Sequence, residues 1–153
     1  MSEQTEDAAR QTHRRLAADL FNFVWTLLDK TERTQAEEDL MVHAAHASCY
    51  HWMQVGQPVN QARGEWQIAR VYAVLGRPEP ARDHAQRCLD ICQENGIGDF
   101  DLAYAYEALA RASAVAGAID ARARYLALAQ EAGERIQDAD DKRLLLGDLA
   151  TIP

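Results

Sequence analysis

Proline and glycine are scarce in this chain of 153 residues, which contains four prolines and eight glycines. Runs of alternating β-branched residues, which are typical of strands, are absent as well. Alanine, the residue with the highest helix propensity, is abundant. These features exclude a β-rich fold and favour helix along nearly the whole chain.

Positive charge is also in short supply. The chain has 16 Lys and Arg residues against 24 Asp and Glu residues, so its formal net charge is −8. A surface of this charge repels phosphate backbones, and we therefore expect no nucleic-acid partner. The basic run His13-Arg14-Arg15 is too short to change this expectation, and we interpret it as the exposed face of a helix.

Long apolar runs are missing, and residues 1–15 are polar. We therefore expect neither a membrane-spanning segment nor a secretory signal. The three cysteines are an odd number and fall within expected helices rather than in loops. This usage predicts a cytoplasmic protein with reduced thiols and no membrane partner.

Apolar residues recur every three or four positions, which predicts six amphipathic helices and a short seventh one. We expect residues 1–5 to be disordered and residues 6–153 to form a single helical domain. Thr5 and Thr34 are the expected caps of the first two helices, and Asp138 is the expected cap of the last. The first six helices are expected at about residues 6–30, 35–55, 59–75, 78–95, 100–116 and 119–136.

An internal repeat organises the second half of the chain. Gly76 and Gly117 lie 41 positions apart and close equivalent turns, because YAVLG ends the segment before one and SAVAG the segment before the other. One helix pair cannot bury its own apolar face, but stacked pairs can. The sequence therefore predicts an all-α fold of about three antiparallel helix pairs plus a short C-terminal capping helix.

The best repeat resembles the tetratricopeptide repeat (TPR) family. That family has small residues where its two helices cross, an aromatic residue before the turn, and glycine at the turn. The matching positions here are Ala69, Tyr72, Gly76, Ala81, Ala85 and Cys88. The resemblance covers about residues 60–136 and implies a TPR-like superhelix.

TPR arrays bind peptides or protein segments on a concave face that is lined by the first helix of each pair. Transferred by position, the resemblance implies a protein–protein interaction module with a peptide-binding groove, formed by Arg63, Trp66, Arg70, Tyr104, Glu107 and Arg111. Arginine beside tryptophan suits a carboxylate or an acidic segment. The alternative is that Trp66 belongs partly to the core and that the arginines are exposed to solvent or pair with Glu65 and Glu107.

The first helix carries an unusually wide apolar face, to which Phe21, Phe23 and Trp25 contribute. A terminal repeat without a polar outer face tends to be covered by another surface. We therefore expect a homodimer that forms through this helix.

A second stripe suggests a different function. Asp39, His43 and His46 lie three or four positions apart on one helix, followed by Tyr50, so their side chains share a face. Histidines at i and i+3 can share a metal ion, which gives the alternative of a small metal- or ligand-binding helical protein. A complete site needs a ligand from another helix, and a packed polar helix face explains the stripe equally well.

No catalytic motif is present, so we expect neither an enzyme nor a cofactor. His84, Cys88 and Cys92 lie one turn apart, and we interpret the two cysteines as small buried residues at a helix crossing. Glu65 and Glu107 offer a carboxylate pair in principle, with surface ion pairs to arginine as the alternative.

Overall fold

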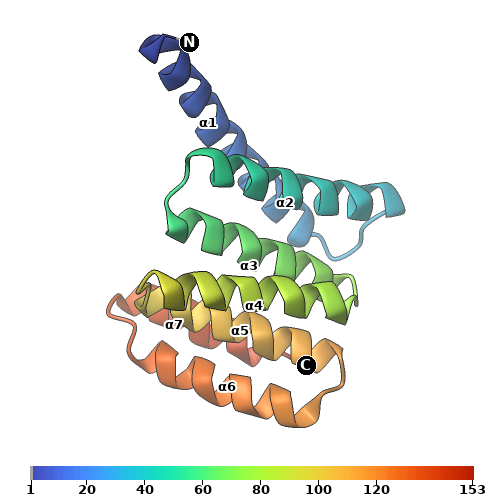
Figure 1. Cartoon of the computed structure of the whole chain (residues 1–153). Coiled ribbons are helices and arrows are strands. Elements are labelled where there is room, and N and C mark those ends of the chain that lie inside the picture. The colour runs from blue at the N-terminus through green and yellow to red at the C-terminus, as the bar shows by residue number, and fades with distance from the viewer. Residues whose placement is uncertain (1) are drawn as a thin grey trace.

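The computed structural model describes residues 2–153, and these residues form seven α-helices and no strand (Figure 1). The prediction of an all-α fold is confirmed. The helices are α1 (Glu3–Leu28), α2 (Gln35–Val55), α3 (Pro58–Val74), α4 (Pro78–Glu94), α5 (Asp99–Val115), α6 (Ile119–Glu134) and α7 (Ala139–Ala150).

Helix α1 begins earlier than the sequence pattern predicted. Its cap is Ser2 rather than Thr5, because the Ser2 side chain accepts a hydrogen bond from the Thr5 backbone N–H. The stretch that we expected to be disordered is therefore helical from Glu3 onward, and Met1 lies outside the described residues. A serine cap followed by acidic residues stabilises the first turn against the helix dipole.

The other predicted caps form as expected. Thr34 and Glu37 make a capping box at the start of α2, in which each side chain accepts from the other residue's backbone N–H. At the start of α7, Asp138 accepts hydrogen bonds from the backbone N–H groups of Asp140 and Asp141. These local signals explain why both helix starts were predictable to within a residue or two.

The first six helices form three hairpins, α1 with α2, α3 with α4 and α5 with α6, and the hairpins stack in chain order (Figure 1). Helix α2 packs on α3 and α4 packs on α5, while α7 packs on both α5 and α6. The odd-numbered helices also contact one another in the order α1, α3, α5, α7. One side of the stack is therefore built from α1, α3, α5 and α7.

Equivalent turns end α3 and α5. Gly76 and Gly117 have positive φ angles of 71° and 70°, a conformation that glycine adopts without strain. After each glycine, a backbone N–H bonds five residues back to the helix, from Arg77 to Tyr72 and from Ala118 to Ser113. Both helices have 17 residues, which confirms that the two segments are structurally equivalent.

Small residues allow the helices to approach closely. Ala85, Cys88 and Ala110 are buried in the core between α3, α4, α5 and α6. Where α2 crosses α3, a Cβ atom on Gly64 would lie 2.9 Å from the Cys49 sulfur, which leaves no space for a side chain. The close crossing fixes the position of α3 relative to the first hairpin.

Two buried side chains attach α1 to the rest of the stack. The Ser48 hydroxyl donates to the Ala17 carbonyl at 2.7 Å, and the Gln67 amide donates to the Phe21 carbonyl at 2.9 Å. These bonds hold the C-terminal half of α1 beside α2 and α3. The N-terminal end of α1 extends beyond α2, and its residues 3–12 are exposed (Figure 1).

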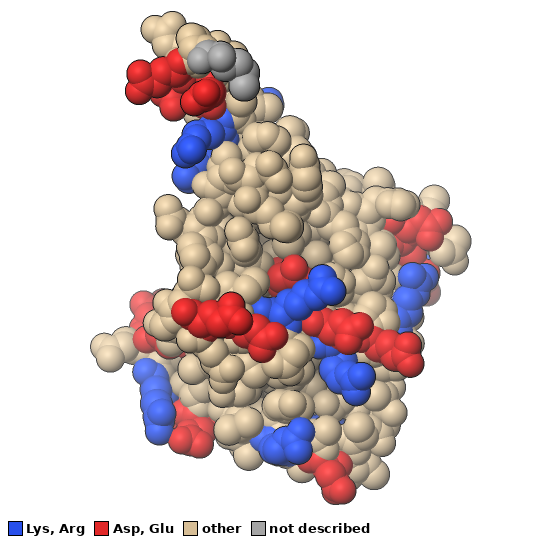
Figure 2. All heavy atoms as spheres, in the orientation of Figure 1, with Lys and Arg blue, Asp and Glu red and all other residues tan. Residues whose placement is uncertain are grey.

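Charged side chains of both signs form a band over α4 on the face shown in Figure 2. Acidic and basic residues are neighbours within this band, so neither sign dominates it. Within residues 2–153, the seven helices are either too short or too polar to cross a membrane.

Candidate functional site: a pocket between the odd-numbered helices

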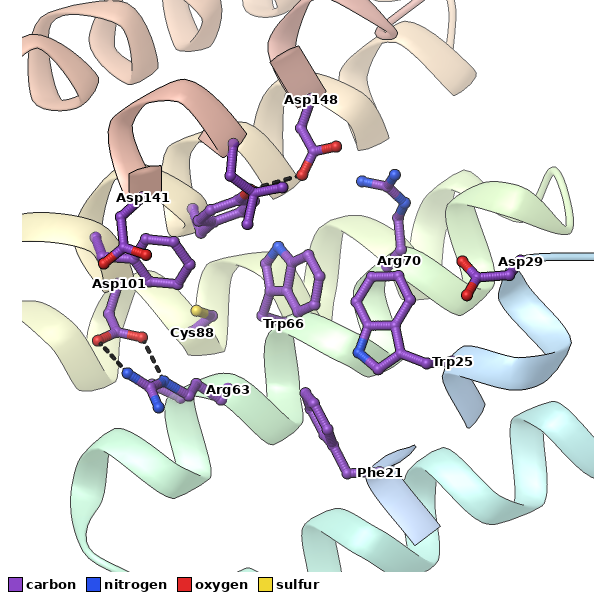
Figure 3. A pocket seen from close by; sticks show the side chains of 14 residues that line it. Phe21, Trp25, Asp29, Arg63, Trp66, Arg70, Cys88, Asp101, Asp141 and Asp148 are labelled. Carbon is purple, nitrogen blue, oxygen red and sulfur yellow. Dashed lines mark hydrogen bonds and ion pairs between the residues drawn. The ribbon is translucent and has the colours of Figure 1, made fainter. Parts of the chain in front are cut away.

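A cavity of about 620 Å³ opens between the odd-numbered helices (Figure 3). We call it the aromatic pocket. Its lining residues come from α1, α3, α5 and α7, with one residue from α4: Phe21, Trp25, Asp29, Ala62, Arg63, Trp66, Arg70, Cys88, Phe100, Asp101, Tyr104, Asp141, Leu144 and Asp148. The volume lies within the range of about 300–1,000 Å³ that is usual for ligand sites.

Aromatic rings form the main wall of the pocket. The rings of Trp25 and Trp66 lie 5.6 Å apart between centroids, and Tyr104 meets Trp66 edge to face at 5.4 Å. Phe100 packs on Tyr104 at 4.7 Å. Phe21 lies at the edge of the same space in Figure 3. Three helices that are distant in sequence thus contribute one continuous apolar surface.

A buried ion network holds this wall in place. Glu107 is 1% exposed and accepts hydrogen bonds from Trp66 Nε1 at 3.3 Å, Arg70 at 3.1 Å and Arg111 Nε at 2.8 Å. Burial lowers the pKa of Arg70, although a guanidinium stays protonated at any physiological pH. Because Glu107 bonds to both arginines and the indole, the Trp66 ring has a fixed orientation.

Helix α7 is attached to the pocket by polar contacts. The Tyr104 hydroxyl donates to Asp148 Oδ2 at 2.6 Å. Burial, followed by this contact with Asp148, raises the pKa of Tyr104, so the hydroxyl remains a donor. Arg111 donates to the Asp148 carbonyl at 3.0 Å and to the Thr151 hydroxyl at 2.9 Å. These bonds position the Asp148 carboxylate at the wall of the pocket.

Arg63 marks the opposite end of the pocket. Its guanidinium makes two bonds to the Asp101 carboxylate, at 2.8 and 3.2 Å, and both groups are drawn in Figure 3. The hydrogen bond with Asp101 raises the pKa of Arg63. The pair links α3 to α5 across the pocket rim.

Four of the six residues that we predicted for the groove line the aromatic pocket: Arg63, Trp66, Arg70 and Tyr104. Glu107 and Arg111 do not line it but lie buried in the network beneath. Their side chains turn toward α3 and α7, because each charge has a partner there. The alternative interpretation was therefore correct for Arg70 and Arg111, which pair with Glu107, and for Trp66, which belongs to the buried core.

Sequence reasoning missed the parts of the wall that come from the two ends of the chain. Phe21 and Trp25 line the pocket, although we had used them to predict a homodimer. Phe23, the third residue in that argument, is 37% exposed. The dimer stays a prediction with less support, because two of its three aromatic residues contact their own chain.

The contribution of α7 had a signal in the sequence. Asp141, Leu144 and Asp148 are spaced three and four positions apart, which places them on one face of the helix. We had interpreted this helix as a polar cap. Only the packing of α7 on α5 shows that the face turns toward the pocket.

A second polar group lies between α2, α3 and α4. We call it the histidine cluster, and its members are Cys49, Glu65, Tyr72, His46 and His84. His84 Nδ1 donates to Glu65 at 2.6 Å, and His46 shares a hydrogen bond of 2.9 Å with the Tyr72 hydroxyl. The two imidazole rings are 5.3 Å apart. Burial lowers the pKa of His46, and the nearby His84 lowers it further.

The predicted metal stripe is not assembled as a ligand set. Asp39 accepts a hydrogen bond from Gln35 at 2.9 Å, and His46 turns toward Tyr72. In the described part of the chain, no group of three or more His, Cys, Asp or Glu side chains is arranged to hold a metal ion. The structure therefore does not bring Asp39, His43 and His46 together with a ligand from another helix.

The three cysteines are buried free thiols. Burial raises the pKa of Cys49 to about 12, so it carries almost no thiolate at neutral pH. A hydrogen bond with Cys92, together with burial, raises the pKa of Cys88. Their burial agrees with the interpretation of Cys88 and Cys92 as small core residues.

Comparison with known proteins does not place the chain in a family: no family model matches it, and neither a curated protein nor a solved structure matches it significantly.

Proposed function

We propose that this protein is a TPR-like interaction module that binds a peptide segment of a partner protein in the aromatic pocket. The observation that carries the proposal is the pocket itself, about 620 Å³ in volume and walled by aromatic residues of three helices. Pockets with apolar walls and a few oriented polar groups are the usual form of a binding site.

The repeat architecture supports a TPR-like arrangement. Helices α3 and α5 are equal in length, end in the same glycine turn, and begin 41 positions apart, at residues 58 and 99. The first helix of each hairpin faces the pocket, as the concave face of a TPR array would require.

The chemistry of the wall also favours a binding role. Large aromatic side chains provide much contact area at a low cost in conformational entropy, and they are enriched where proteins bind partners. Leu144 adds an apolar side chain that is 55% exposed at the pocket. An exposed apolar residue beside fixed aromatic rings suits an extended peptide with one or two apolar side chains.

Two phenylalanines of α1 provide a matched test. Phe21 lines the pocket and Phe23 does not, while neither belongs to the buried core clusters. A peptide is first selected from a random library displayed on phage with the wild-type protein as the target. Its dissociation constant is then measured by isothermal titration calorimetry for wild type, Phe21→Ala and Phe23→Ala.

We expect Phe21→Ala to weaken binding about tenfold, which corresponds to about 1.4 kcal/mol of lost apolar contact. Phe23→Ala should change the dissociation constant less than about twofold, as is usual for residues outside an interface. Thermal unfolding of both variants controls for loss of fold. Equal effects of the two substitutions, or failure to select any peptide, would refute the proposed function.

A further inference from the structure

The arginines of the aromatic pocket already have partners. Arg63 makes two bonds to Asp101, and Arg70 is bonded to the buried Glu107. An acidic ligand would have to compete with these carboxylates, and breaking the Arg70 pair would leave Glu107 short of a partner. The two arginines therefore do not favour an acidic segment as the ligand.

Carboxylates outnumber guanidinium groups at the pocket. Four aspartates and two arginines line it, and the network beneath adds one glutamate and one arginine. Asp29 and Asp141 make no side-chain hydrogen bond or ion pair within residues 2–153, and Asp148 uses only its Oδ2 atom, which accepts from Tyr104. Three carboxylates thus keep oxygen atoms without a hydrogen bond, of which Asp141 faces the charge of Arg63 and Asp148 that of Arg70.

These carboxylates surround an aromatic wall. In Figure 3, Asp29 and Asp141 lie at opposite ends of the pocket, and Asp148 lies above Trp66 beside the guanidinium group of Arg70. An aromatic face attracts a cation through its quadrupole, most strongly when the ring is tryptophan. Aromatic faces beside free carboxylates favour a positively charged group, and the net charge of −8 attracts such a group from a distance.

We infer that the aromatic pocket recognises a basic peptide segment, with a lysine or arginine side chain inserted between the tryptophan rings and the free aspartates. The inference deepens the proposed function and rests on it. The aliphatic stem of the inserted side chain packs on the rings of Trp25 and Trp66. The charged heads of successive basic residues reach Asp29 at one end of the pocket and Asp141 at the other, with Asp148 between them.

Three capped peptides of equal length provide the test: one alternates arginine with serine, and the others carry glutamate or glutamine in place of arginine. Binding is followed by tryptophan fluorescence in a Trp52→Phe background, because Trp25 and Trp66 line the pocket and Trp52 does not. The titrations are run at an ionic strength of about 0.15 M, where charges more than about 8 Å apart are largely screened.

Two double variants that change the net charge by the same amount distinguish binding in the pocket from general electrostatic attraction to the protein. Asp29→Asn with Asp141→Asn removes two free carboxylates of the pocket. Glu79→Gln with Asp83→Asn removes two exposed carboxylates of α4, which lie outside it. We expect the pocket variant to weaken binding of the arginine peptide at least about tenfold, and the α4 variant less than about threefold.

Other results would contradict either the basic ligand, the peptide or the proposed function itself. Equal or tighter binding of the glutamate peptide, or equal effects of the two double variants, would overturn the inference and leave the proposed function intact. If a single capped arginine bound as tightly as the arginine peptide, the pocket would recognise a cationic group but not a peptide segment. If the library-selected peptide also failed to perturb Trp25 and Trp66, the proposed function would fall as well.

Discussion

Two glutamates on the first helices of consecutive hairpins bind basic side chains in different ways. Glu107 on α5 is 1% exposed and bonds to the guanidinium groups of Arg70 and Arg111. Glu65 on α3 is 14% exposed and bonds to the imidazole of His84. The first network places one carboxylate between two guanidinium groups, whereas the second joins one carboxylate to a single imidazole.

The difference shows how much each network depends on its carboxylate. Without Glu107, two partly buried guanidinium groups would remain charged beneath the pocket, because neither can deprotonate. Without Glu65, the His84 imidazole, which is 13% exposed, would lose one hydrogen-bond partner. We therefore expect loss of the Glu107 network to destabilise the fold strongly, and loss of the Glu65 contact in the histidine cluster to destabilise it less.

The largest effect should come from Glu107→Ala. Removing one partner of a buried ion pair typically costs about 3–5 kcal/mol, because the other charge stays buried without compensation. Trp66 also loses the acceptor of its indole N–H. Urea unfolding followed by circular dichroism measures the change in free energy of unfolding, and a loss below about 1 kcal/mol would contradict the buried-network interpretation.

Glu65→Ala should have a smaller effect, about 1–3 kcal/mol, which is typical of a lost hydrogen bond to a charged group. His84 and the Cys49 thiol each lose one hydrogen-bond partner, whereas the loss of Glu107 leaves two guanidinium groups without their carboxylate. The same urea titration ranks the two variants. If Glu65→Ala proved as destabilising as Glu107→Ala, the contrast between a carboxylate that binds two guanidinium groups and one that binds a single imidazole would be wrong.

The third prediction concerns pH. Burial and the neighbouring His84 lower the pKa of His46 in the folded protein, whereas an unfolded histidine titrates near pH 6.5. Just below that pH the unfolded chain binds more protons than the folded one, so the free energy of unfolding falls as the pH drops. Above about pH 7 the contribution is fully present.

His46→Gln is the variant that tests this dependence. Glutamine can still hydrogen-bond to the Tyr72 hydroxyl but does not titrate. We expect a flatter curve of unfolding free energy between about pH 5 and pH 7 than in wild type. His51→Gln is the comparison, because burial and His13 lower the pKa of His51 as well. An unchanged slope in His46→Gln would contradict the assignment of this pH dependence to His46.

The sequence predicted the all-α class and most helix boundaries well, because the signals for them are local. Gly76 and Gly117 end helices through a backbone conformation that the residue type itself favours. Thr34 with Glu37 marks a helix start three residues apart. The start of α1 was missed, because Ser2 and Thr5 are both good caps and only the structure shows which one is used.

The site was only partly predictable, because it depends on contacts between distant helices. Arg63, Trp66 and Arg70 were predicted by transferring the groove positions of the TPR family onto this chain, and all three line the pocket. Helical spacing does not reveal which basic side chain a carboxylate will pair with. Glu107 pairs with Arg70, which lies 37 positions earlier, and with Arg111, which lies four positions later. The positive charge of the ligand that we propose follows from these pairings and from the aspartates at the end of α1 and on α7.

The smallest effect should come from the third carboxylate pair. Arg63 is 51% exposed and Asp101 is 14% exposed, although their guanidinium and carboxylate groups make two bonds. Water screens such a pair, so Asp101→Asn should change the free energy of unfolding by no more than about 1 kcal/mol. High salt should reduce even this difference. The three pairs differ mainly in their burial and in the type of basic side chain. A large effect of Asp101→Asn would therefore show that the geometry of a pair, rather than its burial, determines how much it contributes to the free energy of unfolding.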